Sequence, residues 1–163
     1  MFRFKKNIFF LFFILILGAC QHQQGVENPT LTFHARNDLN VCPKSTVGNG
    51  MSICVYQLTK VDTIKKLLND NYHAGIEFLT DCDKYSFENA SDHSVIETYL
   101  FPLDPGQTNT IQIKSDPTTK YIVIVGDFCH IRRGKCVKIF KRPFTDMSFV
   151  IGKSEIIINE LRY

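Results

Sequence analysis

Short runs of alternating apolar and polar residues recur along this chain, the pattern typical of strands that bury one face. Residues 30–35 place Leu31 and Phe33 on one side and threonines on the other. Residues 121–125 are apolar or aromatic throughout, which predicts a central strand buried on both faces. Eight strands are expected, at residues 30–35, 52–58, 95–101, 110–114, 121–125, 136–140, 147–151 and 155–161.

The segment after the second expected strand follows a helical period instead. Asp62 is suited to cap a helix start. Ile64, Leu67 and Leu68 then fall on one helix face, with lysines opposite. Residues 75–79 predict a second short helical turn. Eight strands with a short helical insertion after the second predict a mainly β fold, a two-sheet antiparallel β-sandwich.

The loops between the expected strands are marked by Gly, Pro, Asn and Asp. Residues 37–50 form the longest such segment ahead of the second strand. After the third strand, Pro105 followed by Gly106 suits the two central positions of a type II turn, because the second of these positions needs a positive φ.

The first residues resemble an export signal followed by the lipobox of bacterial lipoproteins. Three cations precede an apolar run of ten residues at 8–17, too short for a spanning helix of about 20 residues. The sequence Leu-Gly-Ala then leads to Cys20, whose thiol is expected to receive a diacylglycerol. Gln21, where Asp would favour the inner membrane, favours lipid anchoring in the outer membrane.

This pattern divides the chain into three parts. Residues 1–19 are expected to be the signal peptide, residues 20–29 the lipidated N-terminus and a polar tether, and residues 30–163 the β-sandwich domain. The full chain has 19 basic and 16 acidic residues, and the signal peptide holds three of the basic ones. The remainder is therefore balanced at 16 of each, which gives no reason to expect a nucleic-acid partner.

Five further cysteines follow Cys20, and an exported protein enters an oxidising compartment where disulfides form. Any one of the five can be the odd one out, so the sequence leaves the connectivity open. We expect Cys42–Cys54 and Cys129–Cys136, because each pair flanks a loop between neighbouring strands. Cys82 would then be free and buried.

Motifs that carry catalysis are absent from the sequence: there is no Gly-x-Ser-x-Gly, no His-Glu-x-x-His and no phosphate-binding glycine loop. Residues 81–83, Asp-Cys-Asp, are expected to form a solvated turn rather than a carboxylate site. A metal site using Cys129, His130 and Cys136 matches no usual zinc spacing. We therefore expect no enzyme, no cofactor beyond the covalent lipid and no small-molecule substrate.

The order of these features resembles the outer-membrane lipoprotein family of the type VI secretion system, called TssJ, SciN or VasD. The matching segments are the lipobox, the Asn-rich strand end at 37–40, the Tyr-Gln-Leu strand end at 56–58, the Leu-Asp-Pro-Gly turn at 103–106 and the apolar strand at 121–125. The chain departs from the family in its five later cysteines and in lacking a Phe just after the Tyr-Gln-Leu strand.

The resemblance implies a transthyretin-like sandwich without catalysis. It further implies that the protein anchors the periplasmic part of a TssM-like inner-membrane protein to the outer membrane. The family's partner-binding loop maps onto residues 41–51 here. The implied contact residues are Lys44, Ser45, Thr46, Val47 and Asn49. The alternative is a lipid-anchored periplasmic sandwich that binds a ligand or assists envelope assembly.

Overall fold

The computed structural model describes residues 28–89, 94–114 and 116–162. The expected signal peptide and Cys20 lie outside the described residues. The elements in chain order are β1 (Thr30–Ala35), β2 (Met51–Leu58), α2 (Asp62–Asp70), α3 (Tyr72–Thr80), α4 (Cys82–Asn89), β3 (Val95–Leu103), β4 (Thr108–Gln112), β5 (Tyr121–Gly126), β6 (Val137–Lys141), β7 (Asp146–Ile151) and β8 (Ile156–Arg162).

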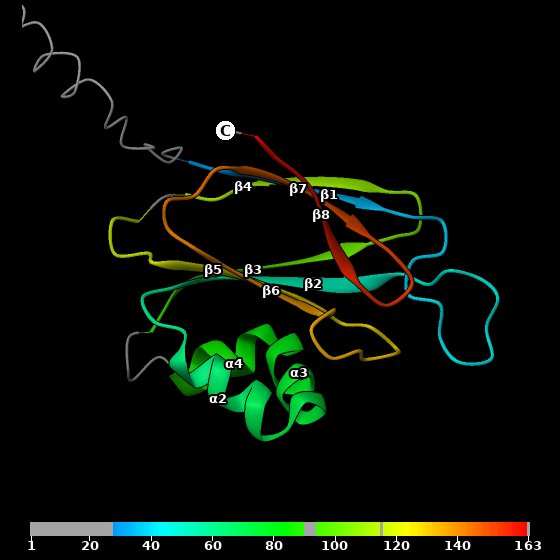
Figure 1. The fold of residues 1–163 in the computed structure, drawn as a ribbon, viewed down its shortest axis with the longest axis horizontal. Helices are drawn as coiled ribbons and strands as arrows, with labels where there is room; N and C mark the ends of the chain where they lie inside the picture. Colours follow the sequence, from blue (N-terminus) through cyan, green and yellow to red (C-terminus); the bar gives the residue numbers. More distant parts are fainter. Residues whose placement is uncertain (1–27, 90–93, 115, 163) are drawn as a thin grey trace, which may run out of the picture.

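The strands form two four-stranded sheets that face each other, in the orders β4-β1-β7-β8 and β3-β2-β5-β6. Figure 1 shows the helices against the outer face of the sheet that contains β2 and β5. That sheet is therefore the middle of three layers, and the central strands β2 and β5 are buried almost throughout. The predicted two-sheet sandwich and the apolar central strand at 121–125 are confirmed.

Aromatic rings fill the spaces on both sides of the middle sheet. Between the sheets, the ring of Phe33 lies 5.2 Å from that of Phe149 and 5.1 Å from that of Phe101, measured between centroids. On the helix side, Tyr56 meets Tyr85 edge to face at 5.1 Å. Both interlayer spaces are thus packed with large apolar side chains, the main source of stability in such a fold.

Strand pairing departs from the expected pattern in one respect: β1 and β7 run parallel, while every other pair is antiparallel. Alternation along a strand records which face is buried and carries no information about the direction of its neighbour. The strand bounds also move. The third strand continues through Pro102 to Leu103, which an edge strand tolerates, and the fourth begins at Thr108 instead of residue 110.

The helical insertion is larger than the sequence suggested. Asp62 does not cap α2: Val61 holds the N-cap position without a side-chain bond, and Asp62 is the first helical residue. The turn expected at 75–79 is the middle of a nine-residue helix, which Asn71 caps by accepting a 3.2 Å hydrogen bond from the N–H of Ala74. Short helices of this kind depend on packing, which local periodicity underestimates.

Residues 81–83 do not form the expected solvated turn, because helix α4 begins at Cys82. The carboxylate of Asp81 accepts a 3.2 Å hydrogen bond from the N–H of Lys84, as an N-cap residue does. Cys82 and Tyr85 are buried at 2% and 1% exposure, so one side of this helix packs into the core.

The expected disulfide pairs are wrong. The structure joins Cys42 to Cys129, with Cα atoms 5.1 Å apart, and Cys54 to Cys82, with Cα atoms 6.1 Å apart. Of the cysteines in the described segments, Cys136 is then the free, buried thiol. The reason is the direction in which successive side chains of β2 point. Cys54 lies on the same side of that strand as Tyr56, toward the helices, so it meets α4 and cannot reach the loop that carries Cys42.

Candidate functional site

The loop between β1 and β2, residues 36–50, lies at one end of the sandwich. Since β1 enters at Thr30 and leaves at Ala35, this loop lies at the end opposite the start of the described chain (Figure 1). The strand itself contributes about 20 Å of separation. We call this end the loop pole and the end at Thr30 the N-terminal pole. The loop pole also carries the β3–β4 turn at 104–107 and the β5–β6 loop at 127–136.

Asn40 ties the loop to its neighbours. Its side chain is 4% exposed, and its Oδ1 accepts a 2.7 Å hydrogen bond from the N–H of Cys129. Its Nδ2 donates to the carbonyl of Gly50 at 3.3 Å. With φ at +46°, Asn40 lies in the left-handed region that Asn tolerates better than most residues. One side chain therefore fixes both the start of β2 and the 127–136 loop against residues 36–40.

The base of the loop is held by further contacts. The Cys42–Cys129 disulfide attaches it covalently to the 127–136 loop. The N–H of Asn49 donates to the carbonyl of Leu39 at 2.9 Å, and Leu39 is fully buried. A Cβ on Gly48 would lie only 2.5 Å from the carbonyl oxygen of Asn37, so only glycine allows this close crossing of the loop over itself. These contacts give the loop one defined conformation.

The tip of the loop presents an apolar side chain. Val47 is 70% exposed. Its carbonyl accepts hydrogen bonds from the hydroxyl of Ser45 at 3.0 Å and from Nδ2 of Asn49 at 3.3 Å. Lys44, at φ +72°, turns the chain ahead of this tip. The structure thus brings the five predicted contact residues into one turn, with Lys44, Thr46, Val47 and Asn49 exposed and Ser45 half-buried.

Two shallow hollows lie at the same pole, and sequence reasoning did not find either. One has a volume of about 510 Å³ and includes Asp104 and Asp127, from the β3–β4 turn and the β5–β6 loop. The other, of about 620 Å³, lies against residues 35–38 and Gly106. The acidic residues of the first hollow come from segments far apart in the sequence, so no local pattern could have grouped them with the loop.

Metal-binding groupings do not emerge among the described residues. No set of three or more His, Cys, Asp or Glu side chains there could hold a metal ion, and Cys129 is engaged in a disulfide. Burial raises the pKa of the Cys136 thiol, whose Sγ accepts a hydrogen bond from the N–H of Arg132 at 3.4 Å. In the described part, no helix is both long and apolar enough to span a membrane.

Comparison with known proteins decides the family. The model of the family described as type VI secretion lipoprotein, VasD, EvfM, TssJ, matches residues 27–159. The chain belongs to the type VI secretion lipoprotein family. The predicted resemblance is thereby confirmed. A comparison with curated proteins finds no match.

Solved structures share the fold of this family member at low sequence identity. The lipoprotein TssJ1 from Pseudomonas aeruginosa aligns with a TM-score of 0.60 and 15% identity, over 83% of this chain and 98% of that chain. Serratia marcescens Lip, a membrane-bound component of the type VI secretion system, aligns with a TM-score of 0.59 and 16% identity, over 83% and 98% of the two chains. These matches support the same β-sandwich architecture.

A third match comes from a structure described as the T6SS protein TssM C-terminal domain from EAEC. It has a TM-score of 0.63 and 12% identity, over 83% of this chain and 100% of that chain. At such identity the likeness shows the fold alone. In this type VI secretion lipoprotein, the Cys42–Cys129 disulfide joins the β1–β2 loop to the β5–β6 loop, and the Cys54–Cys82 disulfide joins strand β2 to helix α4.

Proposed function

We propose that this lipoprotein anchors the periplasmic part of a TssM-like inner-membrane protein to the outer membrane. In this proposal residues 1–19 are removed as a signal peptide, Cys20 carries the lipid, and residues 20–29 are the tether to the sandwich at 30–163. The membership in the type VI secretion lipoprotein family supports this role. The single observation that carries the partner-binding part is the exposed Val47 on a rigid loop at the pole opposite Thr30.

The distances suit such a bridge. Thr30 lies ten positions after Cys20, a span of at most about 36 Å when fully extended. The sandwich adds about 20 Å along β1. With the lipid in the outer membrane, the loop pole would face the periplasm, where a partner rising from the inner membrane would meet it first.

The loop is suited to binding because its shape exists before the partner arrives. The Asn40 hydrogen bonds and the Cys42–Cys129 disulfide fix its base. Ordering a flexible loop opposes association, so a prefixed loop binds at lower entropic cost. Val47 would supply an apolar anchor, and Lys44 a charge that complements an acidic group on the partner. Ser45, Thr46 and Asn49 would surround these two with polar contacts.

A pull-down with the periplasmic domain of the TssM-like protein tests the loop. Val47→Asp places a charge at the tip and should weaken binding by about 1–3 kcal/mol, or roughly 5- to 150-fold. Leu100→Asp is the matched control, because Leu100 is also an exposed apolar residue, at 56%, and lies on β3 opposite Cys54, outside the 36–50 loop. If the Val47 variant and the wild type bind the partner domain with equal affinity, the tip of the loop is not part of the interface.

The anchor is tested separately with Cys20→Ala in the full chain. The wild type should float with outer-membrane vesicles in a density gradient, and the variant should not. If the wild type floats but brings down no secretion protein, the lipid anchor would be supported and the alternative role in the envelope would be favoured. A variant that floats as well as the wild type would show that Cys20 does not carry the anchor.

A further inference from the structure

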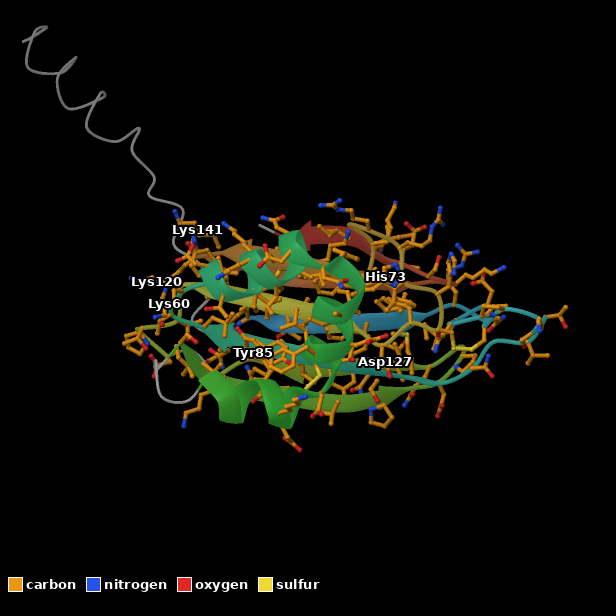
Figure 2. All side chains as sticks on the ribbon, turned by 90° about the horizontal axis from the view of Figure 1, so that it is seen from below. Lys60, His73, Tyr85, Lys120, Asp127 and Lys141 are labelled. Carbon is orange, nitrogen blue, oxygen red and sulfur yellow. A yellow bond between two sulfur atoms is a disulfide. The ribbon has the colours of Figure 1, made fainter. Side chains whose placement is uncertain are left out.

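Basic residues gather at the N-terminal pole, the end that the proposed lipid anchor would hold near the membrane. Figure 2 shows Lys60, Lys120 and Lys141 together at the end where the chain enters the described part, while Asp127 lies toward the other end. All three lysines are exposed. Because the sequence beyond the signal peptide has equal numbers of basic and acidic residues, this grouping is produced by the fold.

Backbone hydrogen bonds bring these residues together from distant segments. The N–H of Lys120 donates to the carbonyl of Leu58 at the end of β2, at 2.9 Å. The N–H of Arg142 donates to the carbonyl of Lys120, also at 2.9 Å, and Tyr121 pairs with Lys141 across β5 and β6. Lys120 and Lys141 therefore lie on adjoining strand ends with fixed backbones.

Arg142 stiffens the turn that precedes Lys120. Its Nη1 donates to the carbonyls of Asp116 at 3.3 Å, Pro117 at 3.0 Å and Thr119 at 3.2 Å. The guanidinium of Arg142 is therefore occupied by backbone carbonyls of this turn. The side chains of Lys120 and Lys141, at the adjoining ends of β5 and β6, are exposed to solvent.

Two carboxylates near Lys120 and Lys141 accept hydrogen bonds from donors within the protein. Asp146 accepts a 2.7 Å hydrogen bond from the N–H of Thr30, and Asp116 accepts one of 2.7 Å from the N–H of Thr118. The Thr118 bonds hold the pKa of Asp116 below its ordinary value. Ion pairs recorded between described residues, Arg36–Asp38 and Lys135–Glu155, lie at the loop pole.

We propose that Lys120 and Lys141 form a docking surface for the anionic phospholipid headgroups of the leaflet that holds the Cys20 lipid. This inference rests on the proposed lipid anchor. Asn28 lies eight positions after Cys20, so the N-terminal pole lies at most about 29 Å from the anchor point and can rest on the membrane. Headgroup attraction reaches about one Debye length, roughly 8 Å, so it acts only when the pole touches the surface. Docking would hold the sandwich upright and direct the Val47 loop away from the membrane.

The test uses the full lipidated protein in vesicles of phosphatidylcholine, with and without about one third phosphatidylglycerol. Brief acetylation followed by mass spectrometry measures how fast each lysine reacts. Lys120 and Lys141 should react several-fold more slowly in the anionic vesicles, and about 0.5 M salt should abolish the difference because it shortens the Debye length. Lys44, at the loop pole, is the internal control and should react equally in both vesicles. Equal rates at Lys120 and Lys141 in both vesicles would overturn the proposal.

Variants supply a second measurement. Lys60, at the same pole, should also react more slowly in anionic vesicles in the wild type. In Lys120→Gln/Lys141→Gln this protection of Lys60 should be lost, since each lysine near an anionic surface contributes roughly fivefold to surface occupancy. The matched control Arg133→Gln/Lys153→Gln removes the same charge from the loop pole and should leave Lys60 protected. Loss of Lys60 protection in both variants would indicate a general charge effect and overturn the docking surface.

Flotation separates this inference from the anchor. A wild type that floats with neutral vesicles has its lipid anchor, so absent lysine protection then contradicts the docking surface alone. A chain that floats only with anionic vesicles, with Lys120 and Lys141 protected, would contradict the lipid anchor and retain the docking surface. A chain that floats with neither would contradict both.

Discussion

The Oδ1 atom of Asn40 accepts a 2.7 Å hydrogen bond from the N–H of Cys129, a residue 89 positions further along the chain. Two positions after Asn40, Cys42 forms a disulfide with the same Cys129. A partly buried hydrogen bond and a covalent bond thus join the β1–β2 loop to the β5–β6 loop at one point. This junction shapes the surface that we propose binds the partner.

Replacing Asn40 should therefore weaken both the fold and the loop. Asn40→Ala removes the hydrogen bond to the N–H of Cys129 and places alanine at a positive φ, which together should cost about 1–3 kcal/mol of unfolding free energy. Urea denaturation followed by circular dichroism measures the loss. Asn69→Ala, on the exposed side of α2, is the control and should stay within about 0.5 kcal/mol. A similar small change for Asn40→Ala would show that the junction does not stabilise the fold.

The disulfide pattern is open to direct mapping. Digestion of the unreduced protein should release peptides that join Cys42 to Cys129 and Cys54 to Cys82. A peptide joining Cys42 to Cys54 would contradict the structure and favour the sequence-based pairing.

Removing the long disulfide should destabilise the protein. Cys42→Ser/Cys129→Ser opens a link across 87 positions and should cost about 2–5 kcal/mol, because the unfolded chain regains conformational freedom. Cys54→Ser/Cys82→Ser, across 28 positions, should cost less in the same urea assay. The reverse order would indicate that native packing, rather than loop closure, decides the contribution.

Cys136 should behave as an inert thiol in the native protein. It is fully buried, and burial raises the pKa of its thiol, so little thiolate exists to react. Iodoacetamide at pH 8 should leave it unmodified in the folded protein and modify it in urea. Alkylation of Cys82 under the same unfolding conditions would mean that the second disulfide is absent.

Raising the pH above the ordinary pKa of tyrosine should lower the free energy of unfolding through the buried Tyr56. Its hydroxyl donates to the carbonyl of Leu79, and burial raises its pKa well above the ordinary value of 10.0. Because the folded pKa exceeds the unfolded one, this stabilisation is present below pH 10 and is lost as pH rises toward the folded pKa. Between pH 8 and pH 10.5, wild type should lose about 1 kcal/mol more unfolding free energy than Tyr56→Phe in urea titrations. Parallel losses in the two proteins would show that Tyr56 ionises normally.

Much of the architecture was predictable from the sequence by itself. The alternation at residues 30–35, the apolar run at 121–125 and the helical period after Asp62 are local records of which side chains are buried. Pro105 and Gly106 predicted their turn, and Gly106 has the positive φ that it requires. The order of such segments was also enough to indicate the family.

Only the tertiary structure decided which distant residues meet. The alternation of apolar and polar residues could not show that the side chain of Cys54 points toward α4, or that Cys42 pairs with Cys129. It also could not show that Asn40 forms a hydrogen bond with Cys129. The grouping of Lys120 with Lys141 likewise depends on the pairing of β5 with β6. Local periodicity is set by burial within one element, whereas these contacts are set by the way separate strands and loops converge at the two ends of the sandwich.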